Sequence, residues 1–152
     1  KDFVIDALQV AEARVAGADW VLLIVALLDT EELDECLAAV QRCSAQAIVE
    51  VHDVTEVQRA LAAGAGCIGI NNRDLRTLTT DLSTFARLRH HVPDSVVCVA
   101  ESGVRTPADA ARLVSDGADA VLVGEALLRA ASPRDACAAM VAAARAAADA
   151  RP

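Results

Sequence analysis

Short apolar runs alternate with amphipathic segments along the whole chain. Five runs are nearly continuous in aliphatic and β-branched residues, which is the pattern of parallel strands buried on both faces. These predicted strands cover residues 20–28, 47–51, 67–70, 95–100 and 120–123. The segments between and around them repeat apolar residues at helical spacing. The predicted helices cover residues 6–16, 30–43, 54–63, 82–91, 107–115 and 133–148.

Residues typical of helix ends support these boundaries. A capping side chain with an acidic or amide group in the first turn marks two helix starts, and a proline suits the first position of two others. These residues are Asp6 with Gln9, Asp29 or Thr30 with Glu32, Pro107 and Pro133. A glycine that can turn left-handed closes three helices, at Gly17, Gly64 and Gly117. The recurrence indicates a repeated βα unit.

Repeated βα units of one polarity form either a doubly wound open sheet or a (β/α)8 barrel. An open nucleotide-binding sheet favours a glycine-rich fingerprint, and the sequence has neither G-x-G-x-x-G nor a P-loop. We therefore predict the α/β class and a partial TIM (β/α)8 barrel, as a single domain over residues 1–152. A full barrel needs about 250 residues. With about five strands and six helices present, we expect the N-terminal βα units, about 100 residues, to be missing.

The amino-acid composition limits the classes of partner that this protein can bind. The 152 residues are 55% hydrophobic and 24% charged, which is typical of a globular protein and excludes disorder. The net charge of −8 repels nucleic acid, and an aromatic content of 2% provides no platform for base stacking. The core is therefore expected to be aliphatic. No apolar stretch reaches the roughly 18 residues of a membrane span, and no signal peptide is visible.

Cysteine and histidine patterns argue against a metal site. The five cysteines are an odd number without a C-x-x-C pair, which favours reduced thiols in a cytoplasmic protein. His52, His90 and His91 lack a second ligand at a suitable spacing. We expect His52 to support the loop after Glu50, and the 90–91 pair to cap a helix end. No metal and no cofactor are predicted.

Polar residues follow most of the predicted strands. They are Glu50, Asn71 with Arg73, Glu101 with Ser102 and Gly103, and Gly124 with Glu125. A carboxylate or amide beside buried valines costs several kcal/mol to desolvate unless it is paired, and barrel active sites lie at the C-terminal ends of strands. These positions therefore predict a site. The small residues at the last two strand ends suit a phosphate, although ordinary turn geometry explains them too.

Six strings carry a resemblance to a known family. They are KDFV at residues 1–4, LLIV at 22–25, VEVHD at 49–53, IGINNRDL at 68–75, AESGV at 100–104 and ADAVLVGEAL at 118–127. In this order and spacing the chain resembles the indole-3-glycerol-phosphate synthases of tryptophan biosynthesis. The resemblance omits the family's first two βα units and most of its third.

The resemblance implies a carbon–carbon lyase acting on a phosphorylated small molecule. The substrate would be 1-(2-carboxyphenylamino)-1-deoxyribulose 5-phosphate, which undergoes ring closure, decarboxylation and dehydration to indole-3-glycerol phosphate. By resemblance Lys1 is the general acid, Glu50 the second acid–base residue, and Asn71 the residue that orients a substrate hydroxyl. Position alone favours a solvated terminal lysine for Lys1. A structural salt bridge is the alternative for Glu50.

Further residues resemble the family's substrate-binding positions. Phe3 is expected to pack on the aromatic part of the substrate, and Glu101 to hold the charged network in place. Arg73 is a substrate-binding candidate, with a structural pairing to Asp74 or Glu50 as the alternative. The phosphate-binding turns are assigned to Ser102, Gly103, Gly124 and Glu125. Glu125 is expected to act through its backbone, because its carboxylate repels phosphate.

Two hypotheses of different class remain open. The family's first strand supplies a further glutamate and a second catalytic lysine, followed by a Ser-Pro-Ser loop, and none of these is present here. The chain is therefore either the C-terminal part of a synthase or a catalytically incomplete assembly module. A different phosphate-binding barrel of the same pathway is a further alternative, which the IGINNRDL and AESGV strings disfavour. We expect the chain alone to be inactive, and to self-associate or pair with the missing N-terminal part.

Overall fold

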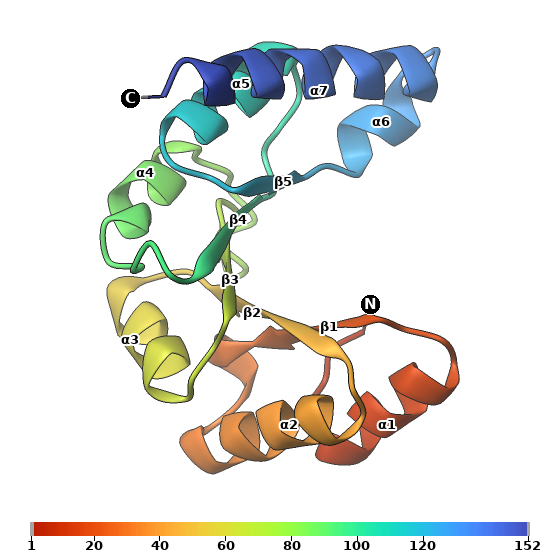
Figure 1. Ribbon diagram of the computed structural model, residues 1–152, viewed down its shortest axis with the longest axis vertical. Helices are drawn as coiled ribbons and strands as arrows, with labels where there is room; N and C mark the ends of the chain where they lie inside the picture. Colours follow the sequence, from red (N-terminus) through yellow and green to blue (C-terminus); the bar gives the residue numbers. More distant parts are fainter. Residues whose placement is uncertain (1, 152) are drawn as a thin grey trace. The chain divides into compact units, whose positions relative to one another are not determined.

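The computed structural model describes residues 2–151 and alternates helices with strands (Figure 1). In chain order the elements are α1 (Ala7–Val15), β1 (Trp20–Ile24), the 3-10 helix η1 (Val25–Leu27), α2 (Thr30–Arg42), β2 (Gln46–Val51), α3 (Val54–Ala62), β3 (Cys67–Asn71), α4 (Ser83–Arg89), β4 (Val97–Glu101), α5 (Pro107–Ser115), β5 (Ala120–Leu122), α6 (Glu125–Arg129) and α7 (Pro133–Asp149). The strands follow chain order in one sheet, and β1–β2 and β4–β5 pair in parallel. Neighbouring parallel strands joined by helices confirm the predicted βα repeat.

The first compact unit comprises residues 2–69 and 91–97. Within it β1 pairs with β2 in a register that places Ile24 opposite Glu50. Figure 1 shows α1 beside α2, and both α2 and α3 contact β2. The fully buried side chains of this unit include Leu23, Val49 and Val57. Each such burial stabilises the fold by about 1.5–3 kcal/mol, and aliphatic residues dominate here as predicted.

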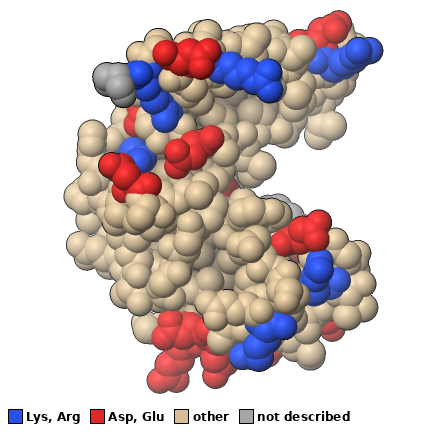
Figure 2. All heavy atoms as spheres, in the orientation of Figure 1, with Lys and Arg blue, Asp and Glu red and all other residues tan. Residues whose placement is uncertain are grey.

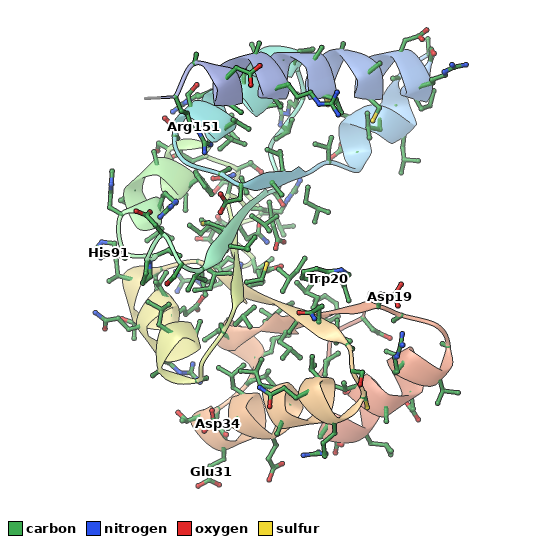
Figure 3. The ribbon with its side chains drawn as sticks, in the orientation of Figure 1. Asp19, Trp20, Glu31, Asp34, His91 and Arg151 are labelled. Carbon is green, nitrogen blue, oxygen red and sulfur yellow. The ribbon has the colours of Figure 1, made fainter. Side chains whose placement is uncertain are left out.

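The second compact unit comprises residues 70–90 and 98–151. Its longest helix, α7, packs along α5 and also contacts α6 (Figure 1). The Arg151 guanidinium, labelled in Figure 3, donates hydrogen bonds to the backbone carbonyls of Val114 and Ala118. The two carbonyls lie at and just after the end of α5, so Arg151 ties the end of the described chain to that helix. The prediction of a single domain over residues 1–152 stays a prediction.

Two element predictions were wrong. The apolar run 20–28 is not one strand, because β1 ends at Ile24 and η1 follows. Arg59 of α3 explains the early end, since its guanidinium donates to the carbonyls of Val25 at 3.2 Å and Leu28 at 2.7 Å. Six helices were expected, whereas the described residues contain seven α-helices. The additional helix is α6, a five-residue helix directly after Gly124.

The helix-end predictions are largely confirmed. Complete capping boxes are present at Asp6 with Gln9 and at Asp29 with Glu32, so Asp29 rather than Thr30 is the cap. Pro107 and Pro133 occupy the first turns of α5 and α7. The three helix-closing glycines have φ of +95°, +81° and +107° at Gly17, Gly64 and Gly117. His90 is the C-cap residue of α4, as the 90–91 pair suggested.

Charged residues lie mainly on solvated helix faces. Figure 2 shows acidic side chains gathered over the end of α2 at which Figure 3 labels Glu31 and Asp34, and both residues are exposed. Among residues 2–151 no helix has the length and apolar character needed to cross a bilayer. The same residues contain no group of three or more His, Cys, Asp or Glu that could hold a metal ion. All five cysteines are free.

The two outermost strands of the sheet carry exposed apolar residues. In the strand order β1 and β5 are the ends. Trp20 at the start of β1, labelled in Figure 3, is 53% exposed, and Leu122 at the end of β5 is 54% exposed. Edge strands present unpaired backbone groups, and exposed apolar residues beside them favour association.

Candidate active site

The buried polar residues of residues 2–151 all lie at the C-terminal ends of central strands. They are Glu50, Asn71, Asn72 and Glu101, with exposed fractions of 3%, 7%, 2% and 4%. Glu50 is the penultimate residue of β2, Asn71 ends β3, and Glu101 ends β4. Buried polar groups are costly to desolvate, so each of these strand ends is a candidate position for functional side chains. Three of the four were predicted from sequence, and Asn72 was not.

Glu50 belongs to a cluster with His52 and Glu56 in the first unit. The His52 Nε2 atom lies 3.2 Å from Glu50 Oε1, and its Nδ1 atom lies 3.1 Å from Glu56 Oε2. The His52 backbone N–H also donates to Glu56 Oε2 at 2.7 Å. Burial acts to lower the pKa of His52, but its hydrogen bonds to the two carboxylates and their charges outweigh this and raise the pKa from 6.5 to about 9. The expected support of the loop by His52 is confirmed.

Asn72 connects three segments of the second unit. Its backbone N–H donates to the Glu101 carbonyl at 2.9 Å, and its Nδ2 donates to the carbonyls of Glu101 at 3.0 Å and Ser102 at 3.2 Å. Its Oδ1 accepts from the Phe85 N–H at 3.0 Å. Asn72 therefore joins the end of β3 to the turn after β4 and to the first turn of α4. The preceding Asn71 accepts a hydrogen bond from the Arg73 N–H at 2.9 Å.

Removal of the Asn72 amide is expected to destabilise the fold. In Asn72→Ala the buried Phe85 N–H loses its acceptor, the Ser102 carbonyl loses the Nδ2 donor, and the Glu101 carbonyl keeps only the bond from the backbone N–H of residue 72. These losses are expected to cost about 1–3 kcal/mol of unfolding free energy. Urea denaturation measures this loss, with the exposed amide variant Gln41→Ala as the matched control. An Asn72→Ala protein as stable as the control contradicts the connecting role.

The turn after β4 is conformationally constrained. Ser102 has φ +62° and Gly103 has φ +86°, so two successive residues occupy the left-handed region. A Cβ at Gly103 would lie 2.6 Å from the Thr80 methyl and 2.9 Å from Leu82 Cδ2, so any other residue would have to displace these side chains and adopt a strained backbone. Non-glycine residues in this region are strained, and such strain occurs frequently at ligand-binding sites. The amide of Asn72 holds this turn at the Ser102 carbonyl.

A cleft of about 870 Å³ lies beside this turn within the second unit. Five predicted substrate-binding residues line it, namely Arg73, Ser102, Gly103, Gly124 and Glu125. Arg105 and Arg129 line it as well, so the cleft contains three guanidinium-bearing residues. Since guanidinium groups and backbone N–H groups both bind anions, this cleft is chemically suited to a phosphate.

Glu125 forms an ion pair with Arg73. The Arg73 Nη2 atom lies 3.7 Å from Glu125 Oε2, and the Arg129 Nε atom lies 3.0 Å from Glu125 Oε1. The sequence-based pairing of Arg73 with Asp74 or Glu50 did not anticipate this contact. Because two guanidinium groups offset its charge, the Glu125 carboxylate repels an anion in the cleft less than an unpaired carboxylate would.

The remaining predicted residues lie in the first unit or at the start of the chain. The side chain of Phe3 is exposed, and its carbonyl accepts a hydrogen bond from the Gln9 amide at 3.4 Å. Lys1, the predicted general acid, lies outside the described residues. The structure thus brings together Arg73, Ser102, Gly103, Gly124 and Glu125 around one cleft, whereas Glu50 and Phe3 belong to the other unit.

A sequence model described as "Indole-3-glycerol phosphate synthase" matches residues 1–140. The chain belongs to the indole-3-glycerol phosphate synthase family. It is 56% identical over 134 residues to a family member from Parafrankia sp. (strain EAN1pec), a match covering 88% of this chain and 50% of that protein. It is 52% identical over 143 residues to one from Kineococcus radiotolerans, covering 94% of this chain and 52% of that protein. The chain spans about half the length of these relatives.

Solved structures show the fold of this family member independently. A 3-hexulose-6-phosphate synthase from Salmonella typhimurium superposes with a TM-score of 0.75 at 20% identity, covering 95% of this chain and 71% of that one. A mandelate oxidase with benzoyl-formic acid superposes with a TM-score of 0.71 at 19% identity, covering 95% and 53%. These likenesses confirm the predicted partial TIM barrel. Every predicted site residue of the synthase family member lies within the matched residues 1–140.

Asn72 shows what the sequence interpretation missed. It follows Asn71 in the INNRDL string, and only one of the two asparagines was assigned a role. An amide directly after a fully buried strand was the available signal, because a buried amide must find several hydrogen-bond partners. The same argument that selected Glu50 and Glu101 therefore applies to Asn72.

Proposed function

We propose that the protein containing this chain is an indole-3-glycerol-phosphate synthase of tryptophan biosynthesis. It would convert 1-(2-carboxyphenylamino)-1-deoxyribulose 5-phosphate to indole-3-glycerol phosphate by ring closure, loss of CO2 and loss of water. The observation that carries the proposal is the coincidence of the family match with the buried Glu50, Asn71 and Glu101 at successive strand ends. We place the protein in the cytoplasm and assign it no cofactor.

The acid–base steps are assigned to Lys1 and Glu50. The Lys1 ammonium protonates the ketone oxygen as the ring carbon attacks it, and stabilises the charge that develops there. Glu50 accepts a proton during dehydration and restoration of the aromatic ring. A buried carboxylate is a competent base only when its charge is stabilised, and the His52 contact at 3.2 Å provides that stabilisation.

The other residues bind and orient the substrate. Asn71 positions a substrate hydroxyl, Glu101 holds the charged groups in place, and Phe3 packs on the aromatic ring. Ser102, Gly103, Gly124 and Glu125 receive the phosphate through backbone N–H groups, and Arg73 contributes charge. The cleft lined by all five of the last-named residues supports this assignment.

A catalytically incomplete module is the second candidate function. The chain spans about half the length of its relatives, and the edge strands β1 and β5 carry the exposed Trp20 and Leu122. On this hypothesis the chain turns over substrate only after it associates with the remaining part of a barrel. Self-association of the isolated chain is a competing use of the same edges.

A chimera tests the proposed function. This chain replaces the matched region of the Parafrankia relative, so that the unmatched part of that relative supplies the remainder of the barrel. We expect the chimera to form indole-3-glycerol phosphate, which is measured by the absorbance of its indole ring. The 152-residue chain alone is expected to form none. A folded chimera without turnover contradicts the proposal, as the relative's own full-length enzyme serves as the positive control.

Phosphate binding is expected to depend on Gly124. A Cβ at Gly124 meets nothing within 4 Å, so Gly124→Val is expected to fold while its side chain fills the approach to the backbone. Titration of inorganic phosphate into the chimera, followed by amide NMR shifts, should show at least about 10-fold weaker binding in the variant. Gly66→Val is the control, since its Cβ also meets nothing within 4 Å and Gly66 does not line this cleft. Equal loss in both variants contradicts a specific phosphate turn.

A further inference from the structure

His52 is held between two carboxylates by both of its ring nitrogens. Glu56, in the first turn of α3, fixes one side of the ring, because its Oε2 atom accepts from the His52 backbone N–H and lies 3.1 Å from Nδ1. That contact directs the opposite nitrogen, Nε2, toward Glu50 Oε1 at 3.2 Å. All three side chains are largely buried, with exposed fractions of 5% for Glu50, 16% for His52 and 15% for Glu56.

Two ionised carboxylates on one ring require a doubly protonated imidazole. A neutral imidazole carries a single N–H, so one of its nitrogens would face a carboxylate with a lone pair. The imidazolium donates to Glu56 through Nδ1, places Nε2 within ion-pair distance of Glu50 and balances one of the two negative charges. The raised pKa of His52, about 9, agrees with this geometry: the ring is charged at neutral pH and loses its charge only as the pH rises through that value.

His52 places a positive charge within ion-pair distance of Glu50. The facing element α3 supplies Glu56 and Arg59, but the Arg59 guanidinium is directed to the carbonyls of Val25 and Leu28. The neighbouring strand β1, whose Ile24 pairs with Glu50, contains no titratable side chain. Glu50 and Glu56 are the two carboxylates that act on His52. The charge on Glu50 is therefore linked to the charge on the ring.

We propose that His52 is a positioning residue for Glu50, holding that carboxylate ionised and in one orientation so that it accepts the substrate proton. The inference rests on the proposed role of Glu50 as an acid–base residue. His52 itself touches no substrate in this scheme. Its contribution is a positive charge that Glu56 holds beside Glu50, and a neutral side chain at position 52 would not supply that charge.

NMR titration tests the geometric part directly. In the chimera, with the three histidines of this chain assigned through His→Gln variants, the ring signals of His52 should titrate near pH 9. Glu50→Gln and Glu56→Gln should each move the His52 titration to lower pH, because each removes one anionic partner. A His52 that titrates near 6.5 in the unsubstituted protein overturns the proposal, whether or not any variant folds.

Kinetics test the positioning part. His52→Gln keeps a neutral amide donor but removes the positive charge. We expect it to lower kcat by about 10-fold to 100-fold and to change KM much less, because Glu50 would lose only part of the rate enhancement that a general base typically gives. The acid limb of the kcat–pH profile should move to higher pH, because Glu50 loses its neighbouring cation. A stability change alone would not move that limb. His91→Gln is the matched control and should match the unsubstituted chimera.

The outcomes separate this inference from the proposed function. If Glu50→Gln retains full kcat, the proposed role of Glu50 is contradicted. The NMR titration is then the only remaining test of the arrangement of His52 between the two carboxylates. If Glu50→Gln loses kcat while His52→Gln keeps both kcat and its acid limb, Glu50 acts without His52 and the inference is overturned. Loss of kcat in both, with the acid limb displaced in His52→Gln, supports it.

Discussion

Replacement of Lys1 by alanine in the chimera is expected to lower kcat by about 10²-fold or more while KM changes much less. A general acid acts mainly in the transition state, so its removal affects turnover rather than substrate binding. Steady-state kinetics of indole-3-glycerol phosphate formation measure both constants. Lys1 is the only lysine among the 14 basic residues of the chain, so no second amine side chain of this chain could replace it.

Lys1→Arg is the matched control for this prediction. Arginine keeps the positive charge, but its guanidinium does not release a proton at neutral pH. We therefore expect Lys1→Arg to lose nearly as much kcat as Lys1→Ala. Recovery of activity in Lys1→Arg would assign Lys1 an electrostatic role, and retention of most of the kcat in Lys1→Ala would exclude it as the acid.

Glu50→Gln is expected to lower kcat by about 10²-fold to 10⁴-fold, the usual contribution of an acid–base residue. The amide keeps the shape of the side chain and removes its charge, so ring closure proceeds and dehydration slows. Rapid-quench analysis should therefore show that a ring-closed intermediate accumulates. Glu35→Gln, on an exposed position of α2, is the control and should leave the time course unchanged.

A thermal melt distinguishes the alternative role of Glu50. The contact with His52 implies some loss of stability in Glu50→Gln, because a buried cation loses an anionic partner. A variant that remains folded but accumulates the intermediate supports the catalytic role. A variant that unfolds, with normal turnover in the folded fraction, supports the purely structural salt bridge.

Local chemistry explains why most element boundaries were predictable. Asp6 and Asp29 form capping boxes with the residues that the sequence indicated, and the cap hydrogen bonds depend only on neighbours three residues away. The end of β1 could not be predicted in the same way. Arg59, more than 30 residues further along the chain, donates hydrogen bonds to the carbonyls of Val25 and Leu28. The pattern of hydrophobic residues does not predict such a contact.

The residues of the candidate site likewise include some that the sequence could predict and some that it could not. Glu50, Asn71 and Glu101 were predictable because polar residues after buried strands must be paired, and the ends of parallel strands carry the functional groups. The pairing of Arg73 with Glu125 was not predictable, since it joins the segment after β3 to the first residue of α6, far along the chain. The left-handed turn at Ser102 was also hidden, because serine seldom adopts that conformation and Asn72 holds it there.

Complementation tests the central claim that this chain supplies one part of a synthase site and a second part completes it. The unmatched portion of the Parafrankia relative is purified as a separate polypeptide and titrated into this chain at fixed substrate. The account predicts no turnover from either polypeptide alone, and synthase activity that rises with the added polypeptide and saturates near equimolar amounts. Turnover by the 152-residue chain alone, or an inactive mixture in which the two polypeptides are shown to associate, would contradict it.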